Sequence, residues 1–269
     1  GDLWASGASV DTAQALVTVP EASAPLQEDL LLQTLAGVRS VLDGLGARLI
    51  GGHTLEGRDG AGLALALCVN GRVAPDRRWG KGPLRPGDGL LLSRALGTGV
   101  LFAAAREGRA RPGWIDQALQ VMQQSQAPLV EILARHGCRA CTDVTGFGLL
   151  GHLGEMLQPG QRVELDLEAL PALPGALDLL AGGAASSLAP ANASALSLLE
   201  GPVTIKPGGD SSREARRQLL IDPQTCGPLL AAVPSGRIEP ALAALRAAGF
   251  SGARLVGRVR PRSDQPGTG

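Results

Sequence analysis

The chain has 269 residues, 25 basic and 25 acidic side chains and 44% hydrophobic residues. This balance excludes a disordered or nucleic-acid-coating protein, and no apolar run reaches the 18 residues expected of a membrane span. The length is that of one large domain or two ordinary ones. Because the other features are those of an intracellular protein, we expect the four cysteines to be reduced thiols and the protein to be cytoplasmic.

The first part of the chain predicts strands around one amphipathic helix. Residues 15–19 (ALVTV) are typical of a short buried strand. A helix is then indicated by apolar residues that recur every three or four positions, before a C-terminal cap at Gly46: Leu31, Leu35, Val38, Leu42 and Leu45. Residues 47–50 predict a second strand, ending at the Gly-Gly-His-Thr of residues 51–54, and residues 63–69 predict a third.

The same order of helix, glycine and strand recurs further along the chain. A helix containing Leu129 and Leu133 ends at Gly137 and precedes a strand in residues 139–144. A helix in residues 241–249 precedes a strand in 253–259. The repeated order predicts mixed sheets covered by helices.

The composition also predicts domain boundaries. Residues 74–89 are rich in proline, glycine and charge, so we expect a linker there between a first domain (1–73) and a second (90–260). Residues 261–269 are expected to form a flexible tail. Residues 201–217 are polar and are expected to form a long exposed loop.

The stretch CTDVTGFGLLGHLGEML, residues 141–157, is the leading candidate for chemistry. Asp143 follows a short buried strand, and Gly146 and Gly148 precede a leucine-rich helix. A helix N-terminus suits phosphate, and a nearby carboxylate suits the Mg²⁺ that accompanies nucleotides. The alternative is an aspartate that only caps the turn or helix.

Other stretches give weaker indications. His53, after two glycines, is either a ligand contact or a surface residue. Cys138 and Cys141 form a Cys-x-x-Cys pair, but no further zinc ligands are evident, and a redox pair usually opens a helix, not a strand. The Leu-Gly-Thr-Gly of residues 96–99 is similar to a phosphate loop without the Walker lysine. In residues 219–233 we expect two strands around an Asp-Pro turn.

Taken together, five stretches resemble selenophosphate synthetase, also called selenide, water dikinase. They are GDLWASGA, GARLIGGHTLEG, LGTGVL, CTDVTGFGLLGHLGEM and DPQTCGPLLAAV. The resemblance implies an α+β fold of the aminoimidazole ribonucleotide synthetase-like type, with an incomplete N-terminal domain. It also implies ATP-dependent conversion of selenide to selenophosphate, with release of AMP and orthophosphate.

The resemblance assigns roles to individual residues. It implies that Asp2 and Asp143 bind Mg²⁺, that Asp2 also contacts the nucleotide, and that Gly52, His53 and Thr54 contact ATP across a homodimer. ATP and selenide are the implied substrates, and neither nucleic acid nor a membrane is an implied partner. Some relatives carry the synthetase behind a flavin-dependent oxidoreductase domain, so such a fusion is also implied.

The sequence departs from the family pattern at two places. The family's reactive Cys or selenocysteine and its lysine precede the GDLWASGA stretch, so we expect them upstream of Gly1 and expect this chain alone to lack turnover. In the last motif, Cys226 stands where the family usually has Ser, and Pro228 stands where it has Gly. Two alternatives remain: another ATP-using enzyme of the superfamily, or a non-catalytic nucleotide-binding module of a fusion protein.

Overall fold

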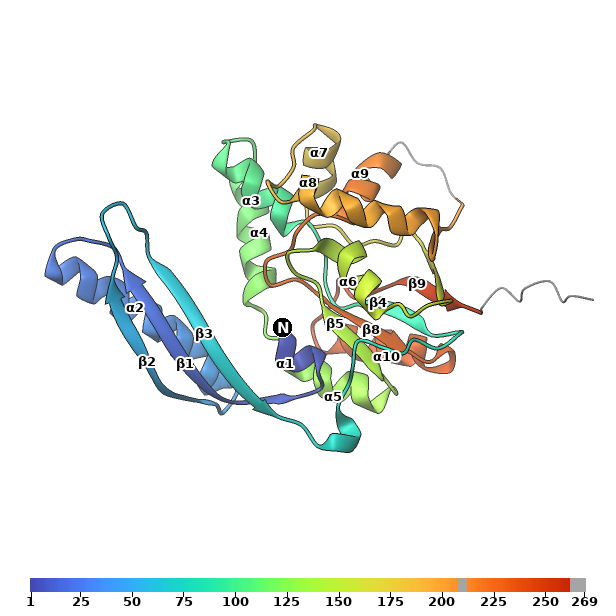
Figure 1. Cartoon of the computed structure of the whole chain (residues 1–269), viewed down its shortest axis with the longest axis horizontal. Helices are drawn as coiled ribbons and strands as arrows, with labels where there is room; N and C mark the ends of the chain where they lie inside the picture. The colour runs from blue at the N-terminus through green and yellow to red at the C-terminus, as the bar shows by residue number, and fades with distance from the viewer. Residues whose placement is uncertain (208–211, 262–269) are drawn as a thin grey trace, which may run out of the picture. The chain divides into compact units, whose positions relative to one another are not determined.

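A computed structural model describes residues 1–207 and 212–261 (Figure 1). The chain divides into two compact units. The smaller unit is residues 8–76, and the larger unit combines residues 1–7 with the chain from residue 77 onward. The tail expected at 261–269 lies, apart from Pro261, outside the described residues.

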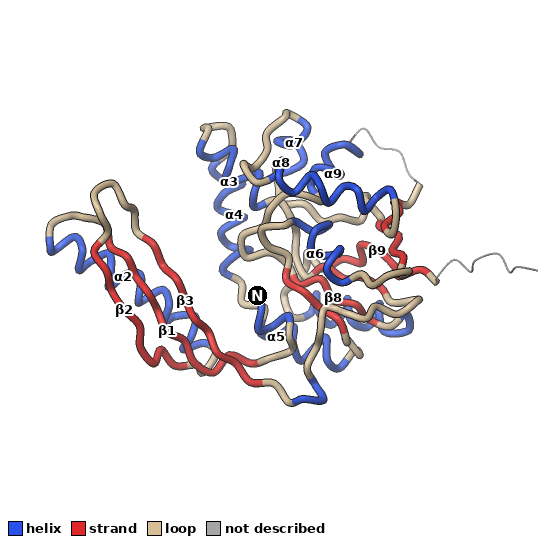
Figure 2. The backbone as a smooth tube through the Cα atoms, viewed as in Figure 1, coloured by secondary structure: helices blue, strands red, loops and turns tan. Residues whose placement is uncertain are grey.

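The smaller unit is a three-stranded sheet with one long helix along one face (Figure 2). Its elements are β1 (Ser9–Val19), α2 (Ala24–Gly44), β2 (Arg48–Glu56) and β3 (Ala64–Arg72). The strand order is β2-β1-β3, with β1 parallel to β2 and antiparallel to β3. The β1–α2–β2 segment is therefore a crossover between parallel strands, which requires a connection of this length.

The alternation of side chains along β1 explains how the sheet is covered. Ala13, Ala15, Val17 and Val19 are buried and belong to the clusters that contain the apolar side chains of α2. Residues on the other face stay open, so that Leu16 is 46% exposed. The helix in residues 24–44 therefore packs on one face of the sheet, whereas the face that carries Leu16 has no cover within this unit.

The larger unit is built on a six-stranded sheet in the order β5-β8-β4-β9-β6-β7. The strands are β4 (Gly89–Leu92), β5 (Ala140–Asp143), β6 (Arg162–Leu165), β7 (Val203–Ile205), β8 (Leu229–Val233) and β9 (Arg254–Arg260). The main helices are α3 (Thr98–Arg106), α4 (Pro112–Gln123), α5 (Ala127–Arg135), α6 (Gly148–Met156), α7 (Ala176–Ala181), α9 (Arg213–Leu219) and α10 (Ile238–Ala247). Shorter helical turns are α1 (Asp2–Ala5), α8 (Ala189–Asn192), η1 (Pro75–Arg77), η2 (Ala193–Glu200) and η3 (Ser235–Arg237).

Two apolar clusters form the core of this unit. One cluster contains α3 and α6, with Leu90 and Leu92 of β4, and the other contains α5 and α10, with Leu91 of the same strand. Because neighbouring residues of a strand point to opposite faces, β4 supplies both clusters. A strand buried on both faces accounts for the uninterrupted apolar run in residues 89–92.

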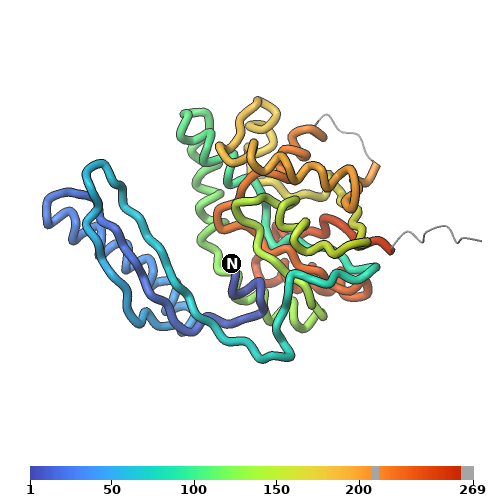
Figure 3. Tube along the Cα trace, viewed as in Figure 1, coloured from blue at the N-terminus to red at the C-terminus, as the bar shows by residue number. Residues whose placement is uncertain are grey.

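The first residues of the chain pack against β5. The turn α1 contacts both β5 and α5, as the blue segment beside green chain in Figure 3 shows. The Trp79 N–H donates to the Ser6 carbonyl (3.1 Å), and Ala5 is buried in the cluster that contains Cys141. Four residues are too few to form a stable isolated helix, so packing fixes α1.

Three local predictions are wrong. The second strand does not end at Gly51–Thr54 but runs through them, because both glycines are extended and pair with β1. Residues 201–217 are not one loop: β7 and most of α9 lie there, on either side of the undescribed residues 208–211. Residues 219–221 are not a strand but the end of α9 and the turn after it, with Leu219 buried.

Gly52 offers a test of how β2 fits against β1. A Cβ atom on Gly52 would collide with the Ala15 backbone, whereas one on Gly51 would have no neighbour within 4 Å. The two glycines have nearly the same φ, 156° and 158°. We therefore expect Gly52→Ala to destabilise the smaller unit by about 1–3 kcal/mol more than Gly51→Ala. Hydrogen exchange of peptides from residues 8–76 measures this, and equal exchange in the two variants would contradict it.

Candidate functional site

Asp143, the last residue of β5, lies beside the start of the chain. A Cβ atom built on Gly1 would collide with the Asp143 carboxylate, so the backbone of residue 1 touches that side chain. Asp2 is the next residue and is exposed at the first turn of α1, and Asp143 is half-buried. The structure thus brings together the two segments that carry the expected Mg²⁺ ligands.

The chemistry of these two residues fits one magnesium ion shared with a nucleotide. Mg²⁺ in nucleotide sites usually takes one or two carboxylates, with phosphate oxygens and waters completing the octahedron. Among the described residues, no group of three or more His, Cys, Asp or Glu side chains could form an all-protein metal cage. The residues present therefore suit a metal that arrives with its phosphates.

The turn after Asp143 serves packing as well as access. Gly148 has a φ of +71°, and a Cβ atom there would lie 2.8 Å from the Ile221 backbone. The N–H groups of Gly148 and Leu150 donate within the protein, to Thr145 and Leu220 carbonyls. A Cβ atom on Gly146 would meet nothing within 4 Å. Of the two expected phosphate-loop glycines, Gly146 is therefore the one with free space around it.

A buried glutamine ties this turn to two others. The Gln224 N–H donates to the Thr145 carbonyl (2.9 Å). The Gln224 Oε1 accepts from the Gly97 N–H (2.9 Å) and from the Thr98 N–H and hydroxyl. Residues 97–98 precede and open α3, residues 144–147 precede α6, and residues 222–227 precede β8. One residue, through its side chain and its backbone N–H, thus links three turns.

Asp222 lies under the first turn of α3. It is 1% exposed, and its Oδ2 accepts from the Gln224 Nε2 (2.9 Å). Its Oδ1 has no partner with hydrogen-bond geometry, although the Gly99 and Val100 N–H groups are near enough to favour the ionised form. Loss of hydration outweighs these contacts and raises the pKa of Asp222 to about 7.

A buried arginine, Arg94, contacts the turn of residues 222–227. The Arg94 guanidinium is 4% exposed and donates to the carbonyls of Val121 and Gln124 and, at 3.3 Å, to that of Cys226. Burial lowers the pKa of Arg94 to about 10, so the side chain remains cationic at neutral pH. Cys226 has a φ of +50°, which is uncommon for a residue with a side chain.

An open hollow of about 640 Å³ lies next to these turns. It is lined by residues of α3, of the three turns and of the segment before α8, which include Thr98, Phe102, Arg106, Gly146, Leu188 and Gln224. In the sequence, residues 96–99 give only a weak indication of a phosphate loop, and neither that stretch nor residues 219–233 alone indicates that the two meet.

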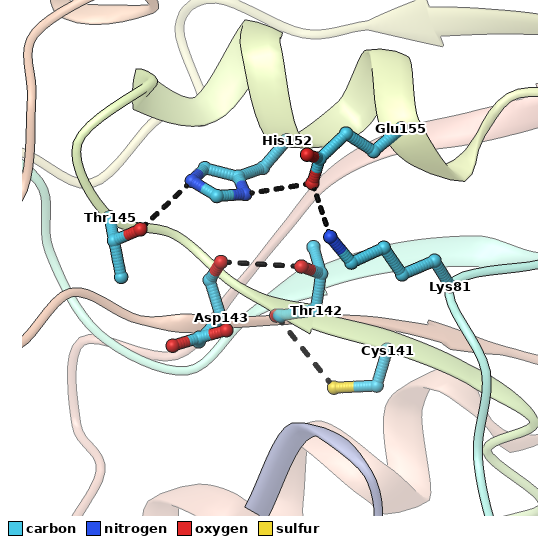
Figure 4. Close-up of polar contacts among 7 residues, drawn as sticks. All are labelled: Lys81, Cys141, Thr142, Asp143, Thr145, His152 and Glu155. Carbon is cyan, nitrogen blue, oxygen red and sulfur yellow. Dashed lines mark hydrogen bonds and ion pairs between the residues drawn. The ribbon is translucent and has the colours of Figure 1, made fainter. Parts of the chain in front are cut away.

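A row of polar side chains runs along α6 behind the turn (Figure 4). The Thr145 hydroxyl lies 3.1 Å from His152 Nε2, and His152 Nδ1 lies 3.2 Å from Glu155 Oε2. Lys81 Nζ donates to the same Glu155 oxygen at 2.6 Å. Burial opposes ionisation of Glu155, but Lys81 and His152 outweigh it and lower its pKa. Sequence reasoning missed this row, since its members are separated along the chain.

The remaining candidates lie elsewhere. Gly52, His53 and Thr54 are exposed residues of β2 in the smaller unit. Cys138 and Cys141 are buried, and their mutual hydrogen bond, with burial, raises the pKa of the Cys141 thiol well above its ordinary value. Since the thiolate is the reactive form, the environment of this pair argues against the redox alternative.

Comparison with known proteins shows the family to which the chain belongs. The domain family described as "AIR synthase related protein, C-terminal domain" matches residues 85–266. The selenide, water dikinase of Geobacter metallireducens is 34% identical over 97% of this chain and 73% of its own length. That of Trichlorobacter lovleyi is 35% identical over 98% of this chain and 73% of its own. The chain belongs to the selenide, water dikinase family.

Solved structures show that this member of the dikinase family shares its fold with more distant proteins. The thiamine-monophosphate kinase of Stenotrophomonas maltophilia matches with a TM-score of 0.68 and 19% identity, over 96% of this chain and 72% of its own. The hydrogenase maturation protein HypE, in a structure with ATP, matches with a TM-score of 0.67 and 20% identity, over 96% and 67%. These likenesses and the described helices and sheets confirm the α+β fold of the aminoimidazole ribonucleotide synthetase-like type. Among the described residues, no helix is both long and apolar enough to cross a membrane.

The raised pKa of Asp222 predicts a pH-dependent stability. Between pH 4 and 7 the folded state retains a proton that the unfolded state has lost, so the free energy of unfolding falls as pH rises. The loss is on the order of a few kcal/mol and is complete above about pH 7. Asp222→Asn should remove this component of the pH dependence, measured by urea unfolding at pH 4.5 and 8.

Asp116→Asn is the matched control, because Asp116 is exposed on α4. This control should keep the wild-type dependence on pH. If Asp222→Asn also kept it, Asp222 would be ionised in the folded protein throughout this range.

Proposed function

We propose that this chain forms the greater part of an enzyme that phosphorylates selenide to selenophosphate at the expense of ATP, with release of AMP and orthophosphate. The supporting observation is the contact between residue 1 and the Asp143 carboxylate in a chain about one third identical to selenide, water dikinases. Because the chain spans 73% of that Geobacter relative, the reactive Cys or selenocysteine and the lysine are proposed to come from residues upstream of Gly1. A cytoplasmic location and, as in some relatives, fusion to an oxidoreductase domain are part of the same proposal.

Asp2 and Asp143 would hold Mg²⁺, and Gly146 would leave room for the phosphates. When bound, the metal neutralises charge on the phosphate oxygens during phosphoryl transfer. The chain's own contribution is positional: α1, which carries Asp2, packs on β5, which carries Asp143, and the Gln224 N–H bonds to the turn that follows Asp143.

A homodimer is also part of the proposal, with Gly52, His53 and Thr54 contacting ATP of the partner subunit. The open face of the three-stranded sheet supports it. His53 lies opposite Leu16 on that face, where Leu16 and Leu55 are 46% and 48% exposed. Exposed leucines on an uncovered sheet face are costly to leave in water and support an interaction surface there.

The function is tested by measuring AMP release that depends on both ATP and selenide. The assay compares the chain alone with the chain joined at Gly1 to those residues of the Geobacter relative that precede its match. We expect turnover only in the joined protein. Turnover by the chain alone would place the catalytic groups within residues 1–269. If the joined protein binds Mg²⁺–ATP but releases no AMP with selenide, a non-catalytic nucleotide-binding module is the better description.

The magnesium site predicts that the two aspartates act together. Asp143→Asn and Asp2→Asn should each weaken Mg²⁺–ATP binding by about 10–100-fold. The double variant should bind Mg²⁺–ATP almost as well as whichever single variant has the lower affinity. Titration calorimetry with and without Mg²⁺ measures this, with Asp116→Asn as the charge-matched control. Independent, additive losses would mean that the two carboxylates do not share one ion.

The dimer predicts that one charge on the open sheet face is disruptive. Leu16→Glu should convert a dimer to a monomer in sedimentation analysis, because the charge would be desolvated at the interface. Leu32, on α2, is 60% exposed on the opposite side of the sheet, and Leu32→Glu is the control that should leave the dimer intact. A wild-type chain that sediments as a monomer would contradict this part of the proposal.

A further inference from the structure

The row formed by Thr145, His152, Glu155 and Lys81 is assigned no role by the magnesium site or by the hollow. Three segments supply it: the turn after β5, the helix α6, and residue 81, which follows a bridge between Gly80 and Ala140 of β5. His152 is 6% exposed, so its ring is shielded from water and depends on these neighbours for hydrogen bonds.

The hydrogen bonds define which nitrogen of His152 carries the proton. Glu155 is held as a carboxylate by Lys81 and can only accept, so His152 Nδ1, 3.2 Å away, must donate. In the neutral imidazole Nε2 then has a lone pair and no hydrogen. The Thr145 hydroxyl, 3.1 Å from Nε2, is therefore the donor of that contact.

We propose that His152 is a positioning residue that fixes the Thr145 hydroxyl as a hydrogen-bond acceptor beside Asp143. With its only hydrogen committed to Nε2, the Thr145 oxygen has lone pairs for a group outside the row. Thr145 follows Asp143 by two residues, and its carbonyl already accepts the Gln224 and Gly148 N–H groups. The free lone pairs suit a donor such as a water bound to a divalent cation at Asp143.

This use of the lone pairs rests on the proposed function, whereas the orientation of the hydroxyl does not. A hydroxyl left free to rotate presents either a donor or an acceptor, and a cation site gains only from the acceptor. Partners of this kind, one step removed from the metal, commonly change metal affinity by about 10–100-fold. Lys81 and Glu155 have a defined part in this arrangement, since they set the tautomer of His152.

Two variants of His152 separate the contacts it makes. The amide of Gln in His152→Gln occupies about the place of Nε2 and can still accept from Thr145. The amide of Asn in His152→Asn occupies the place of Nδ1, so it reaches Glu155 but not Thr145. Thr145→Val removes the hydroxyl at nearly constant shape, and Thr145→Ser retains it.

Orientation is tested by nuclear magnetic resonance of the chain at pH 8, where an ordinary imidazole is neutral. Nitrogen–proton correlation spectra should show His152 with its proton on Nδ1, and a slowly exchanging Thr145 hydroxyl proton that persists in His152→Gln and is lost in His152→Asn. His136, whose Nδ1 lies 2.7 Å from the Ile132 carbonyl, is an internal reference for the same tautomer. A proton on Nε2 of His152 would overturn the proposal.

Affinity for Mg²⁺–ATP tests the consequence. We expect His152→Asn and Thr145→Val to bind about 10-fold more weakly, and His152→Gln and Thr145→Ser to stay within about 3-fold of wild type. Binding of ATP without the metal should be alike in all four. Equal losses in His152→Gln and His152→Asn would overturn the role of the Thr145 contact. If wild type binds no Mg²⁺–ATP, the proposed function fails, and the tautomer and hydroxyl measurements still decide the orientation.

Discussion

The side-chain amide of Gln224 is the contact on which the arrangement of the site depends. Its oxygen accepts from the backbone that opens α3 and its nitrogen donates to Asp222, while the backbone N–H of the same residue donates to the Thr145 carbonyl in the turn after β5. Each of these groups is away from water, where an unmade hydrogen bond costs about 1–3 kcal/mol. A shorter or apolar residue at 224 would leave several such groups unpaired at once. The side chain therefore couples the start of α3 to the 222–227 turn, and the backbone N–H of Gln224 joins that turn to the one after β5.

The same constraint explains the two buried charges nearby. Arg94 satisfies carbonyls at the ends of segments that cannot pair in the sheet, and its positive charge lies under the carbonyl of Cys226. Asp222 is different, because its pKa is raised toward neutrality. Each of these buried charges has one polar atom without a hydrogen-bond partner, Arg94 Nε and Asp222 Oδ1, but only the pKa of Asp222 is moved close to neutral pH. Ionisation of Asp222 is therefore the change in charge that would destabilise this region as pH rises.

Much of the fold could be predicted from local pattern, and the errors have physical causes. The spacing of Leu31, Leu35 and Val38 predicted α2, because apolar residues three or four positions apart lie on one face of a helix. The short apolar stretch before Asp143 predicted β5, because a run of that length is typical of a buried strand. The strand through Gly51 and Gly52 was cut short because glycine usually marks a turn, whereas Gly52 is there to let β2 approach the β1 backbone. Residues 201–217 are polar, yet Leu219 at the end of α9 is fully buried, and a polar helix with a narrow apolar stripe is hard to separate from a loop.

The candidate site was less predictable, since it is formed by tertiary contacts. Nothing in the local pattern around Asp2 distinguishes it from a solvent-exposed aspartate, and only the resemblance pairs it with Asp143. In the structure the segment that carries Asp2 lies against β5: α1 is too short to be stable alone, so its position is set by packing on β5 and by the Ser6–Trp79 hydrogen bond. The His152 row depends on the same edge of the sheet, because Gly80 pairs beside β5 and so delivers Lys81 to Glu155. The surroundings of Asp143 are thus set by the segments that pack on or pair with β5, which are α1, α6 and residues 80–81. A change that shifted this strand would move Asp143, the packing surface of α1 and the Thr145 hydroxyl together.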